Sequence, residues 1–449
     1  MFKKVKGTKD YSPVELFMRN VVTSIFVDKV RKSGFLEIET PIIEPLELFK
    51  RSSEQSEIVK KEMFEFSDKA NRNLVLRPEG TASFIRAYVE NKWFSLPNQK
   101  FYYYGPMFRY EQPQKGRYRQ FYQAGIEIVG EKNYLKDVEA IYLGATILLE
   151  LELPYILKIN SIGDEASRAK YQEDLKQYLL PFKDQLSDIS KERLDSGKVL
   201  RILDDKVDSK LDFMKNAPKI SDYLSEESKT YFNNVQNSLD DLGIPFIVSN
   251  DLVRGLDYYD EIVFEFVYDT NNKSSQSTII GGGRYSNLIS DLGGPNLSSV
   301  GFGLGIDRLV DYLTSLEIFE KDFFEHSVNS FDIYIASTMN EENVNILFKK
   351  FYTPLIDISG IDLYFEYDAI KSNKAYERAK KYQAKIMISD DVKYKDLFFA
   401  KNLITNEKIY FAKNEEGLRT LFEFFLECEE LDRINEEELY DLIEGDEDE

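Results

Sequence analysis

The segment from residue 101 to residue 130 constrains the fold of this chain more than any other part of the sequence. It begins with the aromatic run Phe-Tyr-Tyr-Tyr at 101–104 and ends with the alternating run Ala-Gly-Ile-Glu-Ile-Val at 124–129, and both runs are typical of strands. Between them, Gln-Pro-Gln-Lys-Gly at 112–116 supplies turn residues. The segment therefore predicts an antiparallel hairpin with a long tip.

The bend of this hairpin mixes arginines with carboxylates and an amide. An arginine at a strand end can bind a phosphate through two hydrogen bonds, while glutamine and glutamate suit an ammonium group or a ring N–H. On charge pattern alone, a solvated edge hairpin and a ligand site are both open interpretations. The side chains concerned are Arg109, Glu111, Arg117, Arg119, Gln123 and Glu127.

Composition narrows the chemistry that this chain can use. Its 449 residues are enough for two or three domains. The single cysteine, Cys428, excludes an intramolecular disulfide, and the single histidine, His326, argues against Ser-His-Asp catalysis and histidine-ligated metals. No apolar stretch approaches the roughly 20 residues of a membrane span, and the N-terminus lacks the pattern of a signal peptide. We expect a soluble cytoplasmic protein whose chemistry uses arginine, glutamate, glutamine and tyrosine.

The net charge of −21 argues against a protein that coats nucleic acid without specificity, because a polyanion would be repelled at long range. A specific RNA partner bound through a local basic face is still compatible with this charge. Much of the acidic excess lies in residues 427–449, where leucines and isoleucines at helical spacing accompany the carboxylates. We expect a short acidic helix there, followed by a frayed tail.

Four other segments combine charged side chains with glycines at strand ends. Pro-Glu-Gly-Thr at 78–81 stands where a predicted strand runs into a predicted helix. Leu-Val-Arg-Gly-Leu-Asp-Tyr-Tyr at 252–259 places a guanidinium beside a glycine and two tyrosines, and Gly-Gly-Gly-Arg-Tyr at 281–285 lets a ligand approach the backbone. Gly-Phe-Gly-Leu-Gly-Ile-Asp-Arg at 301–308 is a glycine-rich strand that feeds a helix. Each segment also has a purely structural interpretation, as a helix-dipole partner, a turn, a bulge or close packing.

In their order along the chain, these segments resemble the motifs of class II aminoacyl-tRNA synthetases. The helix, glycine and proline-interrupted strand at 13–44 resemble motif 1, the hairpin at 101–130 resembles motif 2, and the segment at 301–308 resembles motif 3. The segments at 252–259 and 281–285 resemble two stretches that are specific to histidyl-tRNA synthetases.

The resemblance covers residues 5–411 and implies an α/β fold with an α+β catalytic core, in which an antiparallel class II sheet is flanked by helices. We expect a catalytic domain over residues 1–325, with a helical insertion at about 164–243. Strands and helices that alternate after residue 330 predict a small α/β domain over 330–425 with a largely parallel sheet. The resemblance implies that this domain binds the anticodon and that an acidic tail follows over 426–449.

The resemblance also implies roles for individual residues. Arg254, Arg109 and Arg308 would be catalytic, because guanidinium groups neutralise the charge that develops when a carboxylate attacks an α-phosphorus. No residue is expected to bind a metal directly. The residues expected to bind ATP are Arg109, Glu111, Arg117 and Arg308, and those expected to bind histidine are Glu79, Thr81, Gln123, Glu127, Tyr258, Tyr259 and Tyr285.

Within the histidine set, Glu79 and Thr81 would hold the amino group, and Tyr259 would face the imidazole. Selectivity for histidine needs buried partners for both ring nitrogens, since an unpaired polar group penalises other substrates strongly. The chain departs from the family pattern at Ser53, where glycine is usual, and at Glu57, where aspartate is usual. The expected chemistry depends on neither position.

The function that the resemblance implies is ATP-dependent activation of L-histidine and its transfer to the 3′ end of tRNA(His), with release of diphosphate and AMP. The expected partners are L-histidine, ATP as its Mg²⁺ complex, tRNA(His) and a second copy of the chain in a homodimer, without a tightly bound cofactor or a membrane. The alternative is a non-catalytic histidine-binding regulatory subunit of ATP phosphoribosyltransferase. Such subunits typically lack the C-terminal domain and differ in the catalytic stretches, so the arginines favour the ligase.

Overall fold

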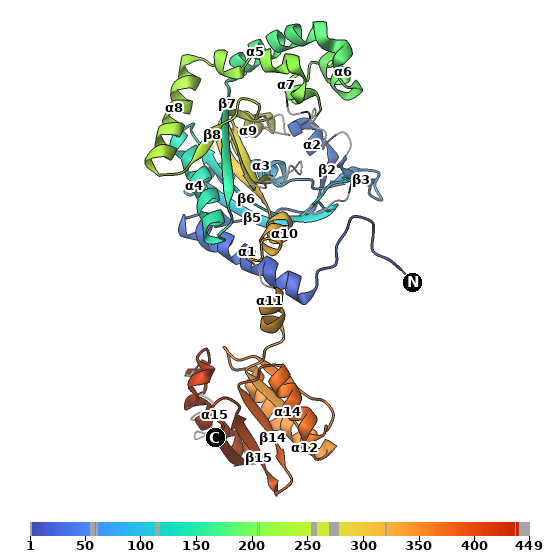
Figure 1. Cartoon of the computed structure of the whole chain (residues 1–449), viewed down its shortest axis with the longest axis vertical. Coiled ribbons are helices and arrows are strands. Elements are labelled where there is room, and N and C mark those ends of the chain that lie inside the picture. The colour runs from blue at the N-terminus through green and yellow to red at the C-terminus, as the bar shows by residue number, and fades with distance from the viewer. Residues whose placement is uncertain are drawn as a thin grey trace. The chain divides into compact units, whose positions relative to one another are not determined.

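The computed structural model of this chain describes residues 2–53, 59, 62–112, 117–203, 205, 207–252, 258–268, 278–318, 321–435 and 437–439. The chain divides into two compact units, one formed by residues 1–319 and the other by residues 320–449 (Figure 1). Within the described residues, no helix combines the length and the apolar composition needed to cross a membrane.

The N-terminal unit is built on an eight-stranded sheet whose strands follow the order β1-β5-β6-β11-β10-β9-β7-β8. The hairpin predicted at 101–130 forms the β5–β6 pair, with Lys100 opposite Ile128 and Phe108 opposite Gln120. The pairs from β5 to β7 are antiparallel, whereas β1 pairs with β5 and β7 pairs with β8 in parallel. The strands are β1 (Leu36–Glu37), β5 (Lys100–Phe108), β6 (Gln120–Gly130), β7 (Tyr155–Gly163), β8 (Phe246–Val248), β9 (Asp260–Tyr268), β10 (Thr278–Tyr285) and β11 (Ser298–Gly305).

Strand β11 shows how this sheet separates a packed face from an open face. Successive side chains of a strand point to opposite faces, so the apolar residues of β11 lie on one face and its glycines on the other. The packed face contacts α4 (Tyr134–Glu150), in which a Cβ at Gly144 would lie 2.9 Å from the ring of Phe266. Gly301 and Gly303 point to the open face, opposite Glu127 and Gly125 of β6.

Helix α1 (Pro13–Lys32) confirms the first predicted helix and shows why it begins where it does. The Ser12 hydroxyl accepts a hydrogen bond from the backbone N–H of Glu15, and the Glu15 carboxylate accepts one from the backbone N–H of Ser12. This capping box satisfies two N–H groups that the helix itself cannot pair. Gly34 follows the helix with a φ of +81°, which favours glycine.

The proline-interrupted strand expected after this helix is two short strands in different sheets. β1 lies at the edge of the large sheet, and β2 (Ile43–Pro45) belongs to a three-stranded sheet in the order β2-β4-β3. Pro41 lies between them, and a proline cannot donate to a strand ladder. The other elements of the N-terminal unit outside the insertion are α2 (Leu46–Ser53), β3 (Phe64–Ser67), β4 (Asn73–Leu76), α3 (Thr81–Glu90), α9 (Leu288–Asp291) and α10 (Ile306–Ser315).

The segment predicted as a helical insertion at 164–243 is helical and has a small core of its own. It appears as the green helices of Figure 1, which follow β7 and precede β8. Its helices are α5 (Glu165–Leu179), α6 (Asp188–Asp195), α7 (Leu200–Leu203) and α8 (Glu226–Asp241). The core includes Tyr171, Leu175, Leu179, Leu186, Leu194, Val199, Ile202, Leu203, Ile220 and Leu224.

The C-terminal unit contains a five-stranded sheet in the order β13-β12-β14-β15-β16. The first three strands of this order are parallel, as the alternation of strands and helices predicts, but β14, β15 and β16 are antiparallel neighbours. The sheet is therefore mixed. Its elements are α11 (Lys321–Val328), β12 (Ile333–Ala336), α12 (Glu341–Leu347), α13 (Thr353–Ile356), β13 (Leu363–Phe365), α14 (Ser372–Lys381), β14 (Ile386–Asp391), β15 (Tyr394–Asn402), β16 (Lys408–Ala412) and α15 (Glu415–Leu426).

The acidic end of the chain contributes to the core of the C-terminal unit. Leu431 and Leu439 are 3% and 0% exposed and pack in the same cluster as Phe425. Arg433 donates to Asp332, with 2.8 Å between Nη2 and Oδ2. The apolar residues of this run thus pack on the unit, at least to residue 439.

An ion pair between Arg284 and Asp137 lies completely buried inside the N-terminal unit. Both side chains are 0% exposed, and Nη2 of Arg284 lies 2.6 Å from Oδ2 of Asp137. Nη1 of Arg284 donates to the Ser298 hydroxyl at 2.6 Å, and the hydroxyl of Tyr231, on α8, donates to Asp137 at 2.6 Å. The pair therefore connects β10, α4 and the insertion.

We predict that Asp137→Asn destabilises the N-terminal unit by about 3–5 kcal/mol, because it leaves a buried guanidinium without its counter-charge. The control Lys215→Gln, which removes a solvent-exposed ion pair with Asp212, should change the free energy of unfolding by less than about 0.5 kcal/mol. Urea unfolding can be followed through the only tryptophan, Trp93, which packs in this unit. Equal stability of the two variants would contradict the role of the pair.

Candidate active site

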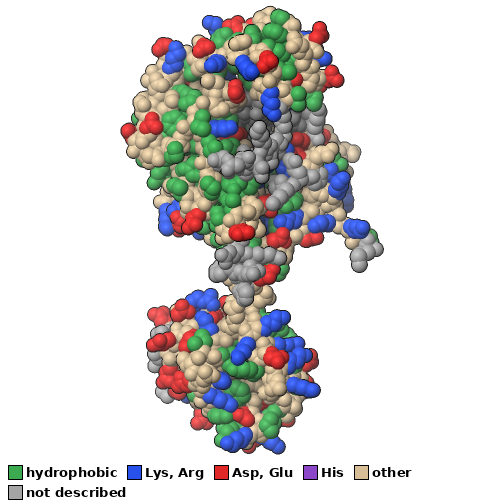
Figure 2. Space-filling model, viewed as in Figure 1, with side chains coloured by type: hydrophobic (Ala, Val, Ile, Leu, Met, Phe, Trp, Pro, Cys, Tyr) green, Lys and Arg blue, Asp and Glu red, His purple; other side chains and the backbone are tan. Residues whose placement is uncertain are grey.

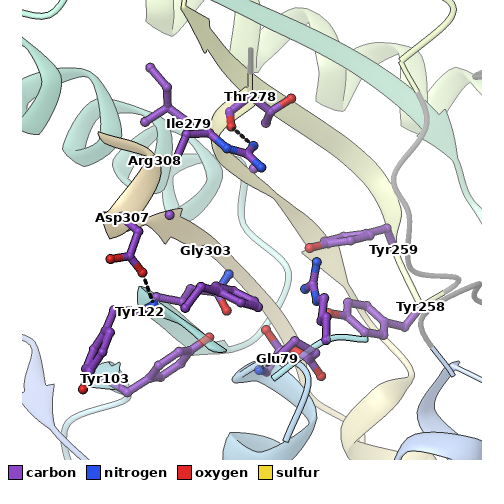
Figure 3. A pocket seen from close by; sticks show the side chains of 16 residues that line it. Glu79, Tyr103, Tyr122, Tyr258, Tyr259, Thr278, Ile279, Gly303, Asp307 and Arg308 are labelled. Atoms are coloured by element: carbon purple, nitrogen blue, oxygen red, sulfur yellow. Dashed lines mark hydrogen bonds between the residues drawn. The ribbon is translucent and has the colours of Figure 1, made fainter. Parts of the chain in front are cut away.

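A pocket opens on the glycine-bearing face of the large sheet (Figure 3). Its walls come from the start of α3, the β5–β6 hairpin, the residues just before β9, strands β10 and β11, and the start of α10. In Figure 3, Tyr258 and Tyr259 lie on one side of the pocket and Arg308 lies on the other. The lining residues are Glu79, Thr81, Tyr103, Arg109, Phe121, Tyr122, Gln123, Tyr258, Tyr259, Thr278, Ile279, Gly281, Gly303, Gly305, Asp307 and Arg308.

Glu79 places a buried carboxylate at the start of α3. Its two oxygens accept hydrogen bonds from the backbone N–H groups of Thr81 and Ala82, at 2.6 and 2.8 Å. These N–H groups are unpaired within the helix, so the carboxylate stabilises the first turn. Burial nevertheless raises the pKa of Glu79, and these amides only partly offset the rise. A cation in the pocket would therefore be favourable beside it.

Glu127 lies below the pocket floor and is surrounded by hydroxyl groups. Its Oε1 accepts hydrogen bonds from Thr81 at 2.8 Å and Tyr103 at 3.1 Å, and its Oε2 accepts one from Tyr285 at 2.5 Å. Burial is the main cause that raises the pKa of Glu127 to about 8, and the nearby carboxylate of Glu79 adds to the rise. The two carboxylates thus form an acidic pair, and the positive charge of Arg109 only partly offsets the raised pKa of Glu79.

Two glycines of β11 leave room for side chains that extend from the neighbouring strand β6. A Cβ at Gly301 would overlap the Glu127 carboxylate, and a Cβ at Gly303 would overlap the Gln123 amide. Gly305 differs, because a Cβ there would lie 3.7 Å from its nearest neighbour, the Cβ of Arg308. Glycine at alternate positions therefore lets β6 extend two polar side chains across the floor of the site.

Gln123 has an unused acceptor at this floor. Its Oε1 is buried and has no hydrogen-bond partner among the residues that the structure describes. An unpaired buried acceptor of this kind is costly unless a ligand or water donates to it. Since Gln123 lines the pocket, a bound molecule with an N–H group could satisfy it.

Tyrosines form the wall on the side of the pocket nearest Glu79. The ring centres of Tyr258 and Tyr259 are 4.8 Å apart, and those of Tyr258 and Tyr285 are 5.5 Å apart. Tyr285 is 2% exposed and lies behind the wall, where its hydroxyl donates to Glu127. Burial raises the pKa of Tyr258 and of Tyr285 well above the ordinary tyrosine value, so both remain neutral donors.

Two guanidinium groups line the pocket: Arg109 lies close enough to Glu79 to favour its ionised form, and Arg308 lies on the side opposite Tyr258 and Tyr259. Nε of Arg109 donates to the carbonyl oxygen of Pro78 at 2.9 Å, and Nη1 of Arg308 donates to the carbonyl oxygen of Thr278 at 2.5 Å. Burial lowers the pKa of Arg308, and the nearby positive charge of Arg117 lowers it further. Such an arrangement of cations favours a multiply charged anion as ligand.

Glu111 and Arg117 lie near these cations but are not among the lining residues. Nη1 of Arg117 lies 2.6 Å from Oε2 of Glu111, so the two side chains neutralise each other. Nε of Arg117 is buried without a hydrogen-bond partner among the described residues. Both residues come from the hairpin, next to its tip at 113–116, which lies outside the described residues.

Asp307 is a pocket residue that the sequence analysis did not identify. Its Oδ1 accepts a hydrogen bond from the Tyr11 hydroxyl and its Oδ2 accepts one from the backbone N–H of Tyr122, both at 2.6 Å. Arg19 stacks on Tyr122, with its guanidinium carbon 3.8 Å from the ring centre. The only feature of the sequence that could indicate a functional role for Asp307 is its position beside Arg308. This feature is weak, because an acidic residue in the first turn of a helix is also expected as a partner of the helix dipole.

The structure brings most of the predicted site residues together. Arg254 lies in the segment 253–257, which is outside the described residues. Glu57 also lies outside the described residues. Glu127 and Tyr285 lie directly behind the pocket rather than on its surface. Among residues with described positions, no cluster of three or more His, Cys, Asp or Glu side chains could hold a metal ion. The predicted residues that line the pocket are Glu79, Thr81, Arg109, Gln123, Tyr258, Tyr259 and Arg308.

Comparisons with known proteins agree with this fold and show the family. The sequence model of the family described as histidyl-tRNA synthetase matches residues 7–309. The chain is 46% identical over 394 residues to the histidine–tRNA ligase of Mycoplasmopsis synoviae, which covers 86% of this chain and 79% of that protein. It is 46% identical over 333 residues to the histidine–tRNA ligase of Lactobacillus delbrueckii subsp. bulgaricus, covering 72% of this chain and 78% of that protein.

A solved structure is also similar over nearly the whole chain. The crystal structure of the apo histidyl-tRNA synthetase of S. aureus superimposes with a TM-score of 0.75 at 33% identity, and covers 95% of this chain and 100% of that one. The antiparallel sheet and its polar pocket thus define a class II aminoacyl-tRNA synthetase. Within that class, the chain belongs to the histidyl-tRNA synthetase family.

The pKa of Glu127 predicts how stability depends on pH. Because the pKa is raised from 4.5 to about 8, the folded state binds one more proton than the unfolded state between these values. The free energy of unfolding should therefore fall as pH rises through this range, with a contribution from Glu127 of up to about 1.4 kcal/mol per pH unit. Glu127→Gln should remove this contribution, which urea unfolding between pH 5 and pH 8 would measure. Parallel pH profiles for the two proteins would contradict the raised pKa.

Proposed function

We propose that this chain is a histidine–tRNA ligase, which activates L-histidine with ATP and transfers it to the 3′ end of tRNA(His). Relatives named histidine–tRNA ligase align with most of the chain and support this activity. The observation that carries the proposal is that one pocket combines buried carboxylates and hydroxyls with the guanidinium groups of Arg109 and Arg308. An amino acid and a nucleotide phosphate can therefore meet in it.

The side of the pocket with the carboxylates suits the amino acid. In the proposal, Glu79 and Thr81 hold the ammonium group, and Tyr259 faces the imidazole. A ring N–H donates to the unpaired Oε1 of Gln123, while Glu127 stabilises the hydroxyl groups around the ring. A substrate that lacks these ring nitrogens would leave buried polar groups unpaired, which is the basis of selectivity.

The side with the guanidinium groups suits ATP, bound as its Mg²⁺ complex. A carboxylate oxygen of histidine attacks the α-phosphorus, and the bond to the diphosphate breaks, which gives histidyl-adenylate. The carboxylate is already a nucleophile, so this step needs no general base. Arg109, Arg254 and Arg308 would neutralise the charge that develops on the phosphates. Arg117, which pairs with Glu111 in this structure, would contact a phosphate of the nucleotide, and Glu111 would lie at the nucleotide end of the site.

The second step transfers histidine to tRNA. A hydroxyl of the terminal ribose attacks the carbonyl carbon of the adenylate, which forms the ester and releases AMP. We propose that the C-terminal unit binds the anticodon of the same tRNA through the basic helix α14. Figure 2 shows Lys and Arg side chains on the part of this unit where α14 lies, and the helix carries Lys374, Arg378, Lys380 and Lys381. These cations suit a polyanion although the whole chain is acidic.

The proposal includes a homodimer in the cytoplasm. In a single chain, Leu36, Ile42 and Ile43 are 44%, 39% and 50% exposed, which leaves apolar surface on the segment that resembles motif 1. A second copy packed on this segment would remove that surface from water.

Amino-acid-dependent exchange between ATP and diphosphate, measured with each of the twenty amino acids and without tRNA, tests the proposal. We predict exchange with histidine alone. Arg308→Ala should lower the exchange rate by about 100-fold or more, because one group that stabilises developing charge is lost. Histidine binding without any exchange would contradict the ligase and favour the regulatory subunit of ATP phosphoribosyltransferase.

A further inference from the structure

The helical insertion holds the backbone of a residue that lines the pocket. Arg168, in the first turn of α5, donates a hydrogen bond from Nη1 to the carbonyl oxygen of Tyr259. Tyr259 lines the pocket and directly precedes β9. Its ring lies so close to Gly283 that a Cβ there would be 2.8 Å from it, so the position of the ring depends on the path of this backbone.

Arg168 stands at an unfavourable place for the stability of its own helix. A cation in the first turn is repelled by the positive end of the helix dipole, whereas the N-cap residue Asp164 and the neighbouring Glu165 fit that end well. The charge of Arg168 instead acts on Asp260, which is 7% exposed. Burial raises the pKa of Asp260, and Arg168 opposes this rise. The contacts of Arg168 thus stabilise the start of β9 rather than helix α5.

The next residue of the strand, Glu261, adopts a backbone conformation that needs support. Its φ is +48°, which is uncommon for a residue other than glycine. The pairing of β9 shifts register here with both neighbouring strands. The buried Oε1 of Glu261 accepts hydrogen bonds from Lys132 Nζ at 2.6 Å and from the Ser228 hydroxyl, on α8, at 3.1 Å. The insertion therefore holds this bend from a second helix.

The two helices that hold the bend are also joined to each other. The Ser225 hydroxyl, at the N-cap of α8, donates to Oδ2 of Asp164 at 2.8 Å. The backbone N–H of Ser225 donates to the Ser167 hydroxyl at 3.2 Å. The starts of α5 and α8 thus form one rigid support beneath the residues that follow Tyr259.

From these contacts we infer that Arg168 is a positioning residue for the amino-acid side of the pocket. It does not touch the reacting atoms; it fixes the backbone of Tyr259 from the insertion and thereby sets the affinity for histidine. The inference rests on the proposed function. It makes the helical insertion part of the histidine site and leaves the phosphate side of the pocket independent of it.

The test compares Arg168→Gln, Arg168→Lys and Arg193→Gln with the unchanged chain. Arg193 is the matched control, because its guanidinium pairs with Asp205 inside the insertion, 3.0 Å away. In ATP–diphosphate exchange, Arg168→Gln should raise the KM for histidine about tenfold, as expected for a lost charged hydrogen bond, while the KM for ATP stays within about twofold. Arg168→Lys should recover part of the affinity, and Arg193→Gln should leave both KM values unchanged.

A purely structural role predicts a different result. If Arg168 only stabilised the insertion, Arg168→Gln would lower the active fraction, and hence kcat, without changing either KM, and this result would overturn the inference. Histidine binding to the same variants, measured by calorimetry, separates the inference from the proposed function. Absence of exchange in the unchanged chain contradicts the ligase, whereas an unchanged Kd in Arg168→Gln contradicts the positioning role.

Discussion

The rest of the site depends on one constraint, the burial of the Glu127 carboxylate beneath the floor of the sheet. The carboxylate fits there because β11 has glycine at the position opposite it, and because hydroxyl groups of Thr81, Tyr103 and Tyr285 donate to it. A buried carboxylate without a counter-charge is unfavourable, and its raised pKa expresses this. In the proposed function, the site of the amino acid therefore favours a ligand that carries a positive charge.

The fold divides the two substrates between parts of the chain with different supports. In the proposed function, residues from α3 and from the start of β9 face the amino acid, and the insertion holds the backbone of Tyr259 through Arg168. In the same proposal, arginines from the hairpin and from α10 face the phosphates, and the mutual repulsion of these arginines favours a polyanion as ligand. The hairpin contributes to both sides, through Gln123 and through Arg109, whereas the insertion supports only the start of β9. A change in the insertion can therefore alter the affinity for the amino acid without altering the affinity for the nucleotide.

Local pattern and the order of the motifs predicted much of the fold, but they did not predict contacts between segments that are distant in the sequence. The alternation of β6 and the position of helix α1 follow from local pattern, and both predictions are confirmed. The position of Tyr285 behind the wall and the contact of Tyr11 with Asp307 depend on packing across the sheet, which periodicity does not encode. The apolar stripe of the acidic run was recognised in the sequence, but its packing in the core of the C-terminal unit, with Leu439 fully buried, was not predicted for the same reason.

The measurement that tests this account most directly is the number of protons released when histidine binds at pH 7. It can be obtained by calorimetry in buffers that differ in ionisation enthalpy. With a pKa of about 8, Glu127 is mostly protonated in the empty site, and a bound cation favours its ionised form. The account predicts that the chain releases nearly one proton more than its Glu127→Gln variant. Equal proton release by the two proteins would contradict it.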